Sequence, residues 1–154
     1  MVEVGEKAPA FSGKDQDGNT VALKDFSGQK LAIYFYPKDN TPGCTKQACN
    51  LRDNWSSLKK HGVAIVGVSA DSVKSHDKFA SKYDLPFPLI SDPEKKMLSR
   101  YGAWGEKNMY GIKRIGIKRT TFLVDESGEV VHVIKRPKTA DHAAEILKKF
   151  GLSD

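Results

Sequence analysis

The chain has 154 residues, of which 39% are hydrophobic and 29% charged, and 25 Lys and Arg against 19 Asp and Glu give a net charge of +6. This composition excludes disorder, collagen and coiled coils, and the length favours a single domain over residues 1–154 whose core needs no disulfide. The longest apolar runs, 31–36 and 63–68, are far shorter than the roughly 20 residues of a membrane span.

The first half of the chain alternates extended and helical patterns. A hairpin turn is indicated at 17–18, and the apolar run 30–36 predicts a central strand that is buried on both faces. A capping threonine followed by proline predicts a helix over 42–60, which ends in cations and a glycine. A second buried strand is expected over 63–69, and an amphipathic helix over 73–83.

The second half continues this alternation. A short helix is expected within 92–102, and four glycines indicate a loop over 102–118. Strands 119–125 and 129–135 flank a turn and predict a hairpin, and an apolar stripe predicts a final helix over 140–150. The element order is that of an α/β thioredoxin-like fold: a central mixed sheet flanked by helices, with an N-terminal hairpin extension and a central insert.

Both cysteines of the chain, Cys44 and Cys49, fall in one ten-residue block. As the third residue of its predicted helix, Cys44 meets unpaired N–H groups and the positive end of the helix dipole, which favour a thiolate. The periodicity fits a buried structural cysteine equally well. On an ideal helix the two Cα atoms are roughly 8.7 Å apart, too far for a disulfide, so bonding requires the first turns to unwind. Oxidation by peroxide suits this process because the sulfenic acid can wait for a second thiol.

The spacing of Pro37, Thr41 and Cys44 resembles the active-site motif of the peroxiredoxins. The second cysteine, five residues later, is similar to the peroxiredoxin Q, or bacterioferritin comigratory protein, branch of that family. Matching stretches follow along nearly the whole chain, at 5–11, 66–69, 101–107 and 119–125. The resemblance implies a thioredoxin-dependent thiol peroxidase without a cofactor or metal, which reduces hydrogen peroxide and organic hydroperoxides in antioxidant defence and redox homeostasis.

The resemblance also implies roles for individual residues. Cys44 becomes the peroxidatic cysteine, and Cys49 resolves its sulfenic acid through an intramolecular disulfide. The peroxide site is completed by four further residues: Pro37, Thr41, Gly43 and Arg119. In this site Thr41 holds the peroxide through its hydroxyl, Arg119 supplies a fixed positive charge, and Pro37 shields the pocket. Gln47 stands where many relatives carry Glu, and it is given no catalytic role.

Two arginines in similar basic settings, Arg114 and Arg119, compete for the role of fixed cation. Only Arg119 is followed by a strand-forming run, and we expect that strand to lie beside strand 63–69, where it would bring Arg119 to the helix N-terminus. A guanidinium there would stabilise negative charge on the departing oxygen. Without the resemblance, an exposed loop cation is the alternative.

Other interpretations use the same cysteines. A thioredoxin-type disulfide reductase needs a C-x-x-C motif and a cis-proline before the hairpin, but the chain has C-x4-C and no proline between Pro93 and Pro137. A zinc or copper module could draw on four histidines, His61, His76, His132 and His142. However, no Cys/His spacing matches a zinc template, and His61 and His76 are explained as a helix-terminal cation and a helix-face residue. A redox sensor begins with the same sulfenic acid and stays open.

The remaining expectations concern surroundings and partners. The lysines are dispersed among acids without a nucleic-acid-binding motif, so we expect neither a nucleic-acid nor a membrane partner. The N-terminus lacks a secretory signal, which favours the cytoplasm, with an organellar form also open. Resolution within one helix needs no second chain, so we expect a monomer.

Overall fold

A mixed sheet forms the centre of the structure. Its strands are β1 (Ser12–Lys14), β2 (Thr20–Ala22), β3 (Lys30–Phe35), β4 (Val63–Ser69), β5 (Leu89–Ser91), β8 (Thr120–Val124) and β9 (Val130–Ile134). The computed structural model describes residues 1–152. The seven strands lie in the order β2-β1-β5-β4-β3-β8-β9, in which β3, β4 and β5 are parallel and the outer strands pair antiparallel.

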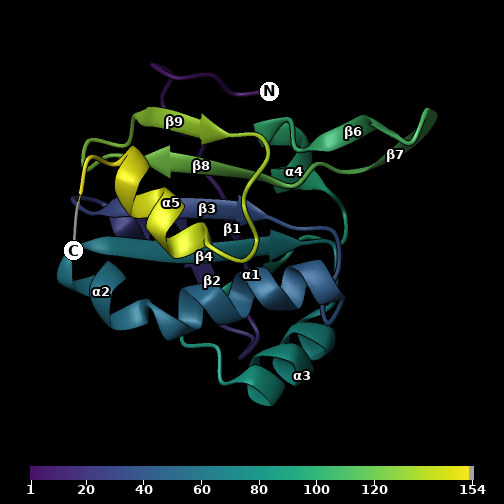
Figure 1. Cartoon of the computed structure of the whole chain (residues 1–154), viewed down its shortest axis with the longest axis horizontal. Helices are drawn as coiled ribbons and strands as arrows, with labels where there is room; N and C mark the ends of the chain where they lie inside the picture. Colours follow the sequence, from purple (N-terminus) through teal and green to yellow (C-terminus); the bar gives the residue numbers. More distant parts are fainter. Residues whose placement is uncertain (153–154) are drawn as a thin grey trace.

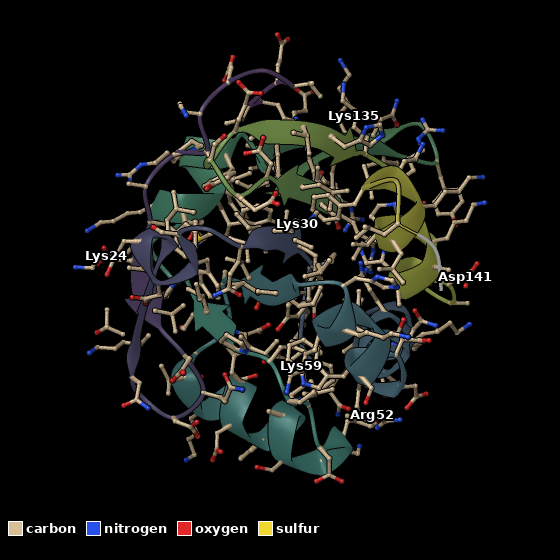
Figure 2. The ribbon with its side chains drawn as sticks, turned by 90° about the vertical axis from the view of Figure 1, so that its left-hand side faces the viewer. Lys24, Lys30, Arg52, Lys59, Lys135 and Asp141 are labelled. Atoms are coloured by element: carbon tan, nitrogen blue, oxygen red, sulfur yellow. The ribbon has the colours of Figure 1, made fainter. Side chains whose placement is uncertain are left out.

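Helices flank this sheet on both faces. They are α1 (Pro42–Asp53), α2 (Trp55–Lys60), α3 (Val73–Tyr83), α4 (Lys96–Tyr101), α5 (His142–Lys149) and a short 3-10 helix, η1 (Leu23–Phe26). Figure 2 shows α1 and α5 on one side of the sheet and the N-terminal hairpin with α4 on the other. Across the part of the chain that the structure describes, no helix has the length and apolar character to cross a membrane.

Strand β3 divides the core into two halves because its side chains alternate between the faces of the sheet. On one face the core beneath α1 and α5 takes in Ala32, Tyr34 and, directly after the strand, Tyr36. The side chains on the other face join the core beneath α4: Leu31, Ile33 and Phe35. All six are at most 1% exposed, which confirms the prediction of a central strand buried on both faces.

The single helix predicted over 42–60 is wrong in one respect, because it is broken at Asn54. The side chain of Asn54 donates from Nδ2 to the carbonyl of Asn50 at 2.8 Å, and the backbone of Asn54 turns out of helical geometry. Asparagine competes for backbone partners in this way and favours helix ends. The chain therefore starts a new helix, α2, at Trp55.

The loop predicted over 102–118 is also wrong. This segment is a second hairpin, β6 (Trp104–Met109) and β7 (Ile112–Ile117), and it projects from the body of the molecule (Figure 1). Its turn residues Tyr110 and Gly111 have φ values of 54° and 78°, which match the right-handed twist of the strands. Gly105 and Gly116 lie within the two strands, and glycines in this number are more typical of a loop than of a strand. The three-residue strand β5 was missed as well, because it is too short to show a period.

The strand that follows Arg119 lies beside β3, not beside β4 as the sequence predicts. β4 already pairs with β3 on one edge and with β5 on the other, so β8 cannot lie beside it and pairs with the second edge of β3. The antiparallel register sets Thr120 opposite Phe35. The start of β8 therefore lies at the carboxyl end of β3, from which the chain leads into α1.

A buried histidine begins α5. His142 Nε2 lies 2.8 Å from Thr121 Oγ1, and its Nδ1 lies 2.8 Å from Glu145 Oε1. Burial lowers the pKa of His142, and the charge of Arg119 lowers it further, against the opposing effect of Glu145. The folded protein therefore favours the neutral imidazole.

This shift predicts acid sensitivity. Because the unfolded chain protonates His142 first, its contribution to stability is complete above about pH 6.5 and is lost as the pH falls through the lower pKa of the folded state. We expect the unfolding free energy of His142→Gln, measured by urea titration, to fall less steeply from pH 7 to pH 5 than that of wild type. An unchanged slope in His142→Gln would contradict the prediction.

Candidate active site

Cys44 lies in the first turn of α1, as the sequence predicts, and is 1% exposed. Thr41 is the N-cap, and its carbonyl accepts the first helical bond, from the N–H of Thr45 at 2.8 Å. Helix geometry therefore leaves the N–H groups of Gly43 and Cys44 without an intrahelical acceptor. These two donors and the helix dipole favour negative charge at the Cys44 sulfur.

Arg119 reaches Cys44 from the start of β8. Its Nη2 donates to Cys44 Sγ at 3.3 Å, and its Nη1 donates to Gln47 Oε1 at 2.7 Å. Gly43 permits this approach, because a Cβ there would lie 3.3 Å from Nη2. Arg114 is exposed on the projecting hairpin, opposite Lys107. Of the two arginines compared in the sequence, the structure thus brings Arg119 to the cysteine.

Thr41 and Pro37 lie on the loop that joins β3 to α1. The Thr41 hydroxyl does not cap the helix; it donates to the carbonyl of Lys38 at 2.9 Å. This bond uses its hydrogen and leaves its lone pairs available to accept one. Pro37 is half-buried at the start of the loop. The loop thus presents a hydrogen-bond acceptor three residues before Cys44.

Cys49 lies on the same unbroken helix as Cys44 and is half-buried, and both thiols are free. Five residues along an α-helix place two Cα atoms roughly 8.7 Å apart, beyond the range of a disulfide. A bond between the two sulfurs therefore requires part of α1 to unwind.

Gln47 is a contact that the sequence analysis missed. It is fully buried, and its Oε1 holds one arm of the Arg119 guanidinium. Its Nε2 has no hydrogen-bond partner among residues 1–152. The available signal was spacing: residues three apart on a helix share a face, so Gln47 lies on the face of Cys44. Gln47 therefore orients the arginine that contacts the sulfur.

We expect Gln47→Met to weaken peroxide reduction without weakening the fold. Methionine keeps the volume of the side chain, removes the unpartnered Nε2 and leaves Arg119 Nη1 without its acceptor. Hydrogen bonds to charged groups contribute about 1.5–3 kcal/mol, so the rate constant with peroxide should fall between about 10-fold and 150-fold. Stopped-flow kinetics and urea unfolding check both parts. Lys46→Met, on the exposed side of α1, should leave the rate unchanged; the prediction fails if the two variants react alike.

Comparison with known proteins adds independent findings. Residues 4–133 match the AhpC/TSA family. A protein of Coxiella burnetii named putative peroxiredoxin bcp is 49% identical over 97% of this chain and 99% of its own length. Peroxiredoxin Bcp of Escherichia coli (strain K12) is 47% identical over 92% of this chain and 90% of its own.

Two solved structures share the fold. Xanthomonas campestris bacterioferritin comigratory protein, studied for alkyl peroxide reduction, superposes with a TM-score of 0.85 at 39% identity, covering 92% of this chain and 90% of its own. A Cys-to-Ser mutant of Xylella fastidiosa PrxQ gives a TM-score of 0.89 at 32% identity, covering 98% and 96%. These similarities confirm the predicted thioredoxin-like fold class.

Proposed function

This chain belongs to the AhpC/TSA family and is a peroxiredoxin, a thiol peroxidase, and we propose from that premise that Cys44 is its peroxidatic cysteine. The observation that carries the proposal is the Arg119 guanidinium 3.3 Å from a buried sulfur at a helix N-terminus. The substrates proposed are hydrogen peroxide and organic hydroperoxides, including the alkyl peroxides for which the Xanthomonas campestris protein was studied.

In the first step the Cys44 thiolate attacks the terminal oxygen of the hydroperoxide. An S–O bond forms as the O–O bond breaks, so sulfur is oxidised to a sulfenic acid and the leaving oxygen takes a proton to become water or an alcohol. Arg119 and the N–H groups of Gly43 and Cys44 stabilise the negative charge that develops on the oxygens. Thr41 accepts the hydrogen bond of the peroxide, and Pro37 shields the site from water.

In the second step the thiol of Cys49 attacks the sulfenic sulfur, releases water and forms an intramolecular disulfide. Part of α1 unwinds to allow this. A dithiol reductant of the thioredoxin type then supplies two electrons and two protons and restores both thiols. Because resolution takes place within one helix, we propose that the protein acts as a monomer, in antioxidant defence in the cytoplasm. Peroxide-dependent oxidation of thioredoxin by the purified protein tests this cycle.

The role of Cys49 has its own test. After one equivalent of peroxide, wild type should lose both free thiols and remain a monomer on a non-reducing gel. Cys49→Ser lacks the second thiol, so it should accumulate a sulfenic acid at Cys44 that dimedone traps and mass spectrometry detects. A Cys49 thiol that stays free in oxidised wild type would contradict resolution within the chain.

A further inference from the structure

The loop that presents Thr41 is held at its centre by a buried acid. Asp39 is 7% exposed, and its Oδ1 accepts the hydroxyl of Tyr36 at 2.6 Å. Its Oδ2 accepts the hydroxyl of Ser75 at 2.8 Å and faces His76 Nδ1 at 2.6 Å. The backbone N–H of Asp39 donates to Asp71 Oδ2 at 2.8 Å. The loop is thus tied through one residue to Tyr36 directly after β3, to α3 and to the turn after β4.

His76 completes the pairing of this buried carboxylate. By periodicity it is a helix-face residue, and in the structure it is fully buried, with Nδ1 on Asp39 and Nε2 3.0 Å from the carbonyl of Ile90. Both ring nitrogens lie within hydrogen-bond distance of an oxygen, so the ring bridges the Asp39 carboxyl group and the Ile90 carbonyl. Buried polar side chains are stabilised when they are hydrogen-bonded in this way.

The ligand atoms of Asp39, Asp71 and His76 lie within 4.8 Å of one another, as in a metal site. However, the carboxylate oxygens that would hold a cation already accept hydrogen bonds. Asp71 Oδ2, for example, accepts from the Ser69 hydroxyl at 2.7 Å and from the backbone of Asp39. A backbone N–H cannot turn away as a hydroxyl can, so a cation would have to displace the loop. The cluster is therefore a hydrogen-bonded support for the loop.

The support reaches the reactive site through two short links. Lys38, next to Asp39, offers the carbonyl to which the Thr41 hydroxyl donates. On the other side Asn40 has a φ of 61°, a left-handed conformation that an asparagine tolerates but that surrounding contacts must hold. Fixing Asp39 therefore fixes both the direction of the Thr41 hydroxyl and the point at which α1 begins.

We propose that Asp39 is a positioning residue for peroxide reduction, acting through Lys38 and Thr41. This inference rests on the proposed function, in which Thr41 accepts the hydrogen bond of the peroxide. Reaction of Cys44 with iodoacetamide needs the thiolate but no peroxide-binding hydroxyl. The role therefore predicts that the two reactions of the same sulfur separate when Asp39 is changed.

The test compares Asp39→Asn with wild type in both reactions. The asparagine amide has an NH2 group in place of one carboxylate oxygen. Whichever way the amide is turned, this NH2 group faces either Tyr36 or the Ser75–His76 pair in place of an accepting oxygen, so the loop must shift. A misplacement of about 1 Å costs up to about 10²-fold, and we expect the rate constant with hydrogen peroxide to fall between about 10-fold and 100-fold. The rate of alkylation by iodoacetamide should stay within about twofold. Asp77 is an exposed acid on α3, the helix that carries Ser75 and His76, and Asp77→Asn should change neither rate.

Ser75→Ala keeps the test decisive if Asp39→Asn does not fold. It removes one partly exposed contact and should lower the peroxide rate about threefold, the smaller end of a lost hydrogen bond, with alkylation unchanged. Unchanged peroxide rates in the folded variants overturn the proposal, and so does an equal loss in both reactions. Failure of the proposed function would be distinguishable from failure of this inference, because wild type would then not consume peroxide at all.

Discussion

Replacing Cys44 with serine is expected to reduce peroxide consumption to the rate in protein-free buffer. Serine keeps the position and the contact with Arg119, but its hydroxyl is not ionised near neutral pH, and it has no sulfur that could form a sulfenic acid. Loss of hydrogen peroxide, followed by a colorimetric assay with dithiothreitol as the reductant, measures the effect. This is the largest change we predict, because every later step needs the oxidised sulfur.

Cys49→Ser is the matched control for this variant. It removes a thiol from the same helix but leaves the attacking sulfur, so it should still reduce at least one equivalent of peroxide. Both variants should keep the wild-type circular dichroism, because neither thiol is bonded to the other in the folded protein. Peroxide loss at the wild-type rate in Cys44→Ser would overturn the assignment of the nucleophile.

Replacing Arg119 with lysine is expected to lower the rate constant with peroxide about 10²-fold to 10³-fold, the cost of removing one preorganised donor for developing charge. Lysine preserves the charge, but its single ammonium cannot reproduce the planar fork that reaches both Cys44 Sγ and Gln47 Oε1. Stopped-flow measurement of the first oxidation step separates this effect from the later reduction of the disulfide.

Arg114→Lys provides the comparison that the sequence itself suggests. Arg114 sits in a similar basic setting but is exposed on β7, away from the sulfur. The substitution keeps the charge of an exposed side chain and changes no contact with the sulfur, so the rate constant should stay within about twofold of wild type. Similar losses in Arg114→Lys and Arg119→Lys would contradict a specific role for the contact between Arg119 and Cys44.

Most of the elements were predictable because their signals are local. The apolar run of β3, the capping threonine and proline of α1 and the turn between β8 and β9 each lie within a few neighbouring residues. The prediction was wrong where a local signal was ambiguous. Glycines in β6 and β7 imitated a loop, and the capping side chain of Asn54 was hidden inside a continuous apolar stripe.

The sequence by itself determined the chemistry of this protein: two thiols on one helix, the first of them at its positive end, spaced so that they can join only if that helix unwinds. These properties follow from helix geometry and need no distant residue. The sequence favoured Arg119 over Arg114, and the tertiary structure alone decided that its guanidinium contacts the Cys44 sulfur, that Gln47 orients it, and that Asp39 and His76 support the loop. Each of these contacts joins residues far apart in the chain. The contacts of Arg119 depend on the pairing of β8 with β3, and the contact of Asp39 with His76 depends on the packing of α3 against the loop after β3.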